Sequence, residues 1–189
     1  MAVGVGMVQY VLELFFDEAS DARIRAVWKR IARKGFPTPL NLQAYEPHLT
    51  LLVDETPEMD VASLVGELQR WAQGWRPFSV DLVYLGLFVD RTWLVFFGAA
   101  PSQVLLETHR LVYDIGSRYM GAIRDYFAPE LWVPHVTLSF DLQKEQAQNL
   151  LALDWQGTLP LRIQVRGLRL VEVHNAGARE RFRYAFPGV

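Results

Sequence analysis

Apolar and polar residues alternate along the first half of the chain with the periods typical of strands and helices. Residues 7–16 are rich in Val, Leu, Phe and Tyr and predict a buried strand, which Glu13 interrupts. Apolar positions at helical spacing then predict a helix over residues 17–35, capped by Asp17 or Ser20. The pattern continues as strand, helix, strand and strand over residues 48–53, 56–74, 78–90 and 92–100, with a helix start at Thr56–Pro57 and a tight turn at Asp90–Arg91.

The second half begins with a helix that starts at Ser102 and ends in a second strand–helix–strand series. We predict a strand at 135–140, a short helix that Asp141 caps, and two final strands joined by a turn that contains His174. No linker or low-complexity segment separates the halves. The order therefore predicts an α+β fold for residues 1–189, a single domain of two lobes, each an antiparallel sheet with helices on its outer face and a cleft between the lobes.

One short motif occurs once in each half, as PHLTL at residues 47–51 and as PHVTL at residues 134–138. Residues two apart in a strand face the same side of the sheet. The polar residues that share a face are His48 with Thr50, and His135 with Thr137 and Ser139. The apolar residues that face the other way are Leu49, Leu51, Val136, Leu138 and Phe140. The chain has only four histidines, and two of them in this setting are on the order of a 1% event by composition alone.

Two such faces opposed across a cleft suit phosphoryl chemistry that needs no metal. One imidazole can take a proton from the attacking oxygen while the other gives a proton to the leaving oxygen. The two groups must lie on opposite sides of phosphorus, because the attacking and leaving oxygens are roughly in line. The threonine hydroxyls can donate to non-bridging phosphate oxygens as charge develops there.

Other readings of the histidines are weaker. His109 lies in the middle of a predicted helix and His174 in a turn, so both favour structural or solvated roles. Two histidines alone do not complete a tetrahedral zinc site, although acidic residues elsewhere could contribute. The GVGMVQ stretch at residues 4–9 precedes a strand rather than joining a strand to a helix, so it is not a phosphate-binding loop.

Composition narrows the class of protein further. The chain is 51% hydrophobic and 21% charged, which indicates a folded domain, and its net charge of −2 gives no excess of basic residues for binding long duplexes. The absence of cysteine excludes disulfides, thiolate nucleophiles and Cys-based zinc sites. The apolar N-terminus lacks the basic start of a signal peptide, and no apolar run approaches the roughly 20 residues of a membrane helix. We therefore expect a cytoplasmic protein.

The two motifs, His48-Leu49-Thr50-Leu51 and His135-Val136-Thr137-Leu138, resemble the signature of the 2H phosphoesterase superfamily. That superfamily includes 2′-5′ RNA ligases and 2′,3′-cyclic phosphodiesterases. The segments FDEASDARIRAVWKRIARKGFP, PHLTLL and DYFAPELWVPHVTLSF resemble its bacterial 2′-5′ RNA ligase-like branch. The resemblance extends over nearly the whole chain and implies the two-lobed fold of that superfamily.

The resemblance also implies an activity, namely metal-independent chemistry on the 2′,3′-cyclic phosphate or 2′-5′ phosphodiester of RNA ends or nucleotides. Ligation is the same reaction in the reverse direction. His48 and His135 would be the general acid and base, with roles that exchange with direction, and Thr50 and Thr137 would hold the phosphate. Neither a cofactor nor an obligate protein partner is expected. The alternatives are a non-catalytic protein that binds an RNA end or nucleotide in the same cleft, and a metal-dependent hydrolase.

Three further residues are candidates for contact with the substrate. Tyr45 lies just before the first motif, and Arg124 and Tyr126 lie in the loop before the second. Aromatic rings stack on nucleobases, and an arginine pairs with phosphate.

Overall fold

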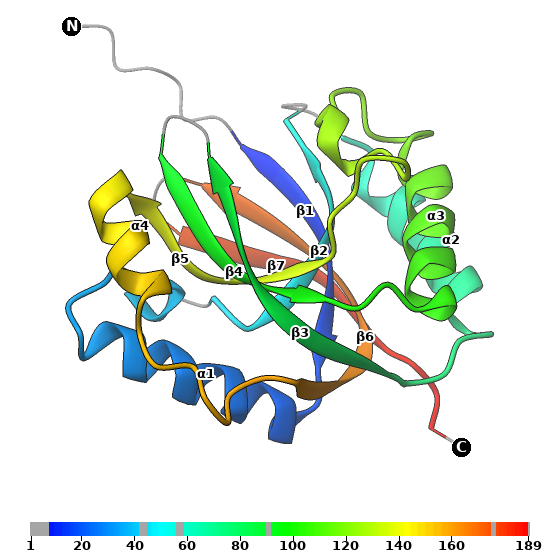
Figure 1. The fold of residues 1–189 in the computed structure, drawn as a ribbon. Helices are drawn as coiled ribbons and strands as arrows, with labels where there is room; N and C mark the ends of the chain where they lie inside the picture. Colours follow the sequence, from blue (N-terminus) through cyan, green and yellow to red (C-terminus); the bar gives the residue numbers. More distant parts are fainter. Residues whose placement is uncertain (1–7, 42–44, 56–58, 90–91, 175–176, 189) are drawn as a thin grey trace, which may run out of the picture.

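The computed structural model describes residues 8–41, 45–55, 59–89, 92–174 and 177–188. Within these ranges the chain forms a seven-stranded antiparallel sheet flanked by helices, which is the predicted α+β class (Figure 1). The strands are β1 Gln9–Phe16, β2 His48–Asp54, β3 Phe78–Val89, β4 Trp93–Ala99, β5 His135–Leu142, β6 Leu161–His174 and β7 Gly177–Ala185. The helices are α1 Glu18–Ala32, α2 Val61–Ala72, α3 Gln103–Gly116 and α4 Lys144–Leu151, with short 3-10 helices at Pro39–Asn41 and Asp125–Phe127.

The long strand β6 joins two halves of the sheet. The pairing order is β2-β1-β6-β3-β4-β5, and β7 also pairs with β6. β6 pairs with β3 through residues 161–165 and with β7 through residues 167–174, so its partner changes near Gly167. A Cβ on Gly167 would lie 2.1 Å from the carbonyl oxygen of Tyr184, and only glycine permits this close approach. The sheets of the two predicted lobes are thus continuous through β6.

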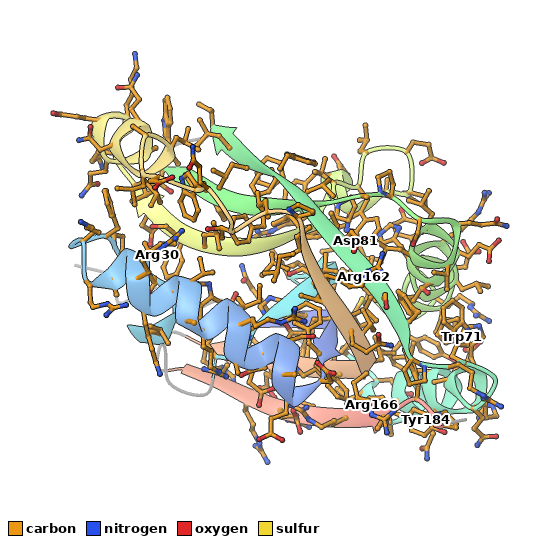
Figure 2. All side chains as sticks on the ribbon, turned by 60° about the horizontal axis from the view of Figure 1, so that its bottom comes forward. Arg30, Trp71, Asp81, Arg162, Arg166 and Tyr184 are labelled. Atoms are coloured by element: carbon orange, nitrogen blue, oxygen red, sulfur yellow. The ribbon has the colours of Figure 1, made fainter. Side chains whose placement is uncertain are left out.

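An exposed ion pair marks the junction of β6 with β3. Arg162 on β6 donates through Nε and Nη2 to the two carboxylate oxygens of Asp81 on β3, at 2.7 and 2.9 Å, and the two side chains point toward each other in Figure 2. The geometry is bidentate, but solvent screens exposed pairs of this kind, so they add little to stability. The pairing of the strands themselves therefore dominates the junction.

One helix from each half of the chain packs against the motif strand of the other half. α1, from the first half of the chain, contacts β5, which carries the second motif, and α4 contacts β4 and β5. α3, from the second half, contacts β2, which carries the first motif, and also contacts α2. Figure 1 shows α1 and α4 at one side of the sheet and α2 and α3 at the other. Each motif strand is therefore supported by a helix from the other half of the sequence.

Several element boundaries differ from the predicted ones. α2 begins at Val61, where Asp60 Oδ1 accepts from the backbone N–H of Ser63 at 3.1 Å; the predicted start at Thr56–Pro57 and the predicted turn at Asp90–Arg91 lie outside the described residues. Asp141 does not cap α4. It belongs to β5 and has a φ of 55°, and Gln143 precedes the helix instead.

The other differences are smaller. His174 is the last residue of β6 rather than part of a turn. Asp17 caps α1, as predicted, by accepting from the backbone N–H of Ser20 at 2.8 Å. No helix in the described ranges is both long and apolar enough to cross a membrane.

Candidate active site

The two strands that carry the motifs lie next to each other in space. β2 and β5 are at opposite ends of the pairing order, yet they contact each other. A cavity of about 710 Å³ opens beside them. Its walls include every site residue predicted from the sequence, namely Tyr45, His48, Thr50, Arg124, Tyr126, His135 and Thr137. The fold thus places both histidines and both threonines at one site.

His48 begins β2, and its ring is held from both sides. Nδ1 lies 2.8 Å from the carbonyl oxygen of Glu46 and 2.8 Å from Glu13 Oε2. Nε2 lies 3.5 Å from the hydroxyl of Tyr45, whose ring meets the imidazole edge-on with centroids 5.0 Å apart. Burial and the charge of Glu13 raise the pKa of Tyr45 well above its usual value, so this hydroxyl keeps its proton at neutral pH.

His135 begins β5 and lies among aromatic rings. Nδ1 lies 2.7 Å from the carbonyl oxygen of Val133, and the rings of Phe88 and Phe96 each lie with their centroids 5.0 Å from the imidazole. Burial lowers the pKa of His135 to about 4; the bond to Val133 opposes this shift and the charge of His48 adds to it. His135 is therefore neutral near pH 7. With Nδ1 donating to Val133, its Nε2 is a proton acceptor.

Both motif strands have the same backbone distortion directly after the threonine. The register of β2 against β1 skips Leu51, and the register of β5 against β4 skips Leu138. Each skipped residue is the last of its motif. An extra residue of this kind is a β-bulge, which interrupts the ladder and bends the strand. The internal repeat therefore extends from the letters of the motif to the shape of its backbone.

The second bulge makes the predicted faces of Ser139 and Phe140 wrong. Strict alternation placed Ser139 beside Thr137 on the polar face and Phe140 on the apolar face. In the structure Ser139 is fully buried and donates to the carbonyl oxygen of Pro37 at 2.5 Å, whereas Phe140 lines the cavity. A shift of one residue moves every later side chain of a strand to the opposite face.

Two tryptophans connect the halves of the molecule at the motif threonines. Trp132 Nε1 donates to the carbonyl oxygen of Thr50 at 3.0 Å, and Trp28 Nε1 donates to the carbonyl oxygen of Thr137 at 2.9 Å. Trp28 belongs to α1 of the first half, and Trp132 follows α3 in the second half, so each indole crosses to the other motif. Both carbonyls lie beside a bulge, where the ladder is interrupted, and the indoles satisfy them.

A buried ionic cluster next to His48 is absent from the predicted site residues. Glu13 Oε1 lies 3.0 Å from Arg169 Nε, and Arg169 Nη1 donates to Glu46 Oε2 at 2.7 Å. Glu13 is 3% exposed and Arg169 is 4% exposed, so the two charges are buried as a pair. The sequence signal was the single acid within the apolar first strand. Its partner lies far along the chain, on β6, and no local pattern identifies it.

Arg124 and Tyr126 lie together on the exposed side of the cavity. Arg124 Nη1 donates to the Tyr126 hydroxyl at 2.7 Å, and Arg124 Nε donates to Glu55 Oε1 at 2.8 Å. Gln9 Nε2 donates to the same glutamate oxygen at 3.2 Å. The guanidinium is thus already paired within the protein, while Tyr126 remains 53% exposed and accessible to a ligand. Within the described ranges, no group of three or more His, Asp or Glu side chains is arranged to hold a metal ion.

Both the sequence and the fold are similar to those of known proteins. Residues 16–177 match the family model of the 2′-5′ RNA ligase superfamily. Similar structures include E. coli LigT with 3′-AMP (19% identity, 96% of this chain and 98% of that chain, TM-score 0.62) and E. coli LigT with NADP+ (16% identity, 95% and 98%, TM-score 0.58). Kluyveromyces marxianus Usb1 with uridine monophosphate is also similar (13% identity, 95% and 97%, TM-score 0.54). No curated protein sequence matches significantly.

Proposed function

Since the chain belongs to the 2′-5′ RNA ligase superfamily, we propose that it is a metal-independent phosphoesterase of 2′,3′-cyclic phosphates or 2′-5′ phosphodiesters. The observation that carries this proposal is the placement of both motif histidines and both motif threonines in the wall of one cavity. A pair of proton-transfer groups at one site is what phosphodiester cleavage requires, whereas binding alone requires none. The reverse reaction, 2′-5′ ligation, uses the same groups.

His135 is the general base when a cyclic phosphate is opened by water. Its surroundings of Phe88 and Phe96 and its low pKa of about 4 leave the ring neutral at physiological pH. The carbonyl of Val133 holds the hydrogen of Nδ1, so Nε2 can accept the proton of the attacking water. As that proton leaves, the water oxygen forms its bond to phosphorus.

His48 is the general acid in the same direction. The carboxylate of Glu13, 2.8 Å from Nδ1, compensates a positive charge on this imidazole, and no comparable carboxylate contact is found for His135 in the described part of the chain. His48 gives its proton to the ribose oxygen as the bond from phosphorus to that oxygen breaks. The products are a ribose hydroxyl and a phosphate monoester. The two hydroxyls of Thr50 and Thr137 donate to the non-bridging oxygens of the phosphate.

Steady-state kinetics on a nucleoside 2′,3′-cyclic phosphate and a 2′-5′-linked dinucleotide test the proposal. The assays contain EDTA and compare the wild type with His48→Ala, His135→Ala and the matched control His174→Ala. His174 is 39% exposed and does not line the cavity. We expect each motif variant to lose about a hundredfold or more in kcat, the usual contribution of a general acid or base, with circular dichroism unchanged and the control fully active.

Three outcomes separate the proposal from its alternatives. No turnover of either substrate by the wild type contradicts the proposal. Nucleotide affinity together with no turnover favours the non-catalytic binding protein. Loss of activity in EDTA with rescue by zinc or manganese favours a metal-dependent hydrolase.

A further inference from the structure

The cavity is apolar away from the two histidines. β1, β2 and β6 present a wall of valines to it, made of Val11, Val53, Val171 and Val173. Phe88, Leu94 and Phe140, from β3, β4 and β5, also line it. Phe140 faces the cavity only because of the bulge in β5. A cavity of about 710 Å³ with such walls has the size and character of a small-molecule site.

The charged side chains of the cavity cancel one another. Glu13, Asp141, Arg124 and Arg169 line it, two acids and two bases. Arg169 is buried between Glu13 and Glu46, and Arg124 is bonded to Glu55 and Tyr126. Among the described lining residues, both arginines are already paired with carboxylates. Neither is therefore available to bind a phosphate other than the one held at the histidines. A strand of RNA carries a charge on every phosphate and binds through rows of unpaired Lys and Arg.

Apolar side chains also continue to the entrance of the cavity. Leu131 is 60% exposed and Phe88 is 37% exposed, and both line the cavity. Exposed apolar surface at the edge of a pocket is characteristic of a binding site for an apolar or aromatic group. These two side chains offer no charged partner to an extended polyanion that leaves the cavity across them.

We infer that the substrate is a small phosphodiester with a single charged phosphate and an aromatic group, in the class of cyclic mononucleotides, and that it is not the end of a long RNA strand. The inference rests on the proposed function and narrows its substrate class. The phosphate lies between the two histidines, and the aromatic group lies against the valine wall and the phenylalanines.

The test compares one nucleoside 2′,3′-cyclic phosphate, free and at the 3′ end of an RNA of roughly ten nucleotides, at about 50 and about 200 mM NaCl. Wild-type kcat/KM and the affinity of the His48→Ala variant are measured for both ligands. We expect the mononucleotide to equal or exceed the RNA in both measurements. The affinity for the RNA should change only about threefold over this salt range, which is the effect of one phosphate contact.

A pair of variants addresses the apolar entrance. Leu131→Ser should raise KM for the mononucleotide several-fold, and because this side chain is exposed the fold should be unaffected. The matched control is Val83→Ser, an exposed valine on β3 that does not line the cavity, and it should leave KM unchanged.

The two levels of the proposal fail in different ways. An RNA preference of tenfold or more with a steep salt dependence, in turnover or in binding, overturns the inference about the substrate and leaves the phosphoesterase function standing. Absence of turnover with both ligands refutes the phosphoesterase function, and the affinities of the His48→Ala variant then decide the substrate class independently.

Discussion

Acid should destabilise this protein through a histidine that takes no part in the proposed reaction. His109 of α3 is 1% exposed, and its ring stacks on Trp132 with centroids 3.9 Å apart and planes 5° from parallel. Burial lowers the pKa of His109 to about 4, and the nearby backbone groups of Leu51 and Phe127 offset part of this shift. The perturbation that tests this effect is His109→Phe, which retains an aromatic ring on Trp132 and removes the titration.

The pKa of His109 in the folded and in the unfolded chain sets the direction and the size of its effect on stability. The unfolded chain has a histidine pKa of about 6.5, above the folded value of about 4, so the unfolded state binds more protons between these pH values. Stability from this group is complete above pH 6.5 and decreases as the pH falls toward 4. The full effect is limited to about 3 kcal/mol, and proton linkage between about pH 7 and about pH 5 amounts to roughly 2 kcal/mol.

Urea denaturation of the wild type and of His109→Phe, at about pH 7 and about pH 5, measures how much stability each protein loses on acidification. We expect the wild type to lose roughly 2 kcal/mol more than His109→Phe on acidification. His135 also has a pKa of about 4, but it is present in both proteins, and its contribution cancels in the comparison. Equal losses in the two proteins would refute the reasoning, because they would mean that His109 is not held neutral by the fold.

Three further substitutions test how the motif strands are supported. Glu13→Gln keeps the shape of the buried acid beside the first motif histidine but removes its charge; kcat on a cyclic nucleotide should fall by roughly tenfold to a hundredfold, and an unchanged kcat would argue against a catalytic role for this charge. Trp28→Phe leaves the carbonyl of Thr137 without its donor, so urea unfolding should show a loss of about 1–3 kcal/mol, and no loss would mean that water replaces the indole. Gly86→Ala places a methyl group 2.1 Å from the ring of Phe96, which packs on the second motif histidine. Both the melting temperature and kcat should therefore decrease, and a decrease in the melting temperature alone would show that the position of this ring is not needed for activity.

The parts of the structure that depend on local pattern could be predicted from the sequence. The α+β fold, the strand positions of both motifs and the superfamily are confirmed. These features follow from the two-residue period of strands and from residues that are adjacent in the chain. The prediction that His109 has a structural or solvated role agrees with its burial in the core, although the sequence did not distinguish these two situations.

The parts that depend on pairing between distant segments could not be predicted. Nothing in the alternation of the second motif strand reveals the bulge that turns Ser139 inward and Phe140 toward the cavity. Glu13 meets Arg169 only because β1 pairs with β6, where these two residues are direct partners in the register. A buried charge is stable only with such a partner, and its partner is set by the register of the sheet rather than by the neighbouring sequence.

The two motifs share the bonds and bulges that position their histidines, but the two histidines have different neighbours. Each motif histidine is bonded through Nδ1 to the carbonyl two residues before it, and each motif threonine is followed by a bulge and bonded by an indole. These shared features place the two imidazoles equivalently, which by itself would leave acid and base interchangeable. The surroundings break this symmetry, because a buried carboxylate adjoins His48 while aromatic rings enclose His135. Position therefore comes from the internal repeat, and the difference in electrostatic surroundings comes from residues that are not repeated, so exchanging those neighbours should alter the pH dependence of turnover without moving either histidine.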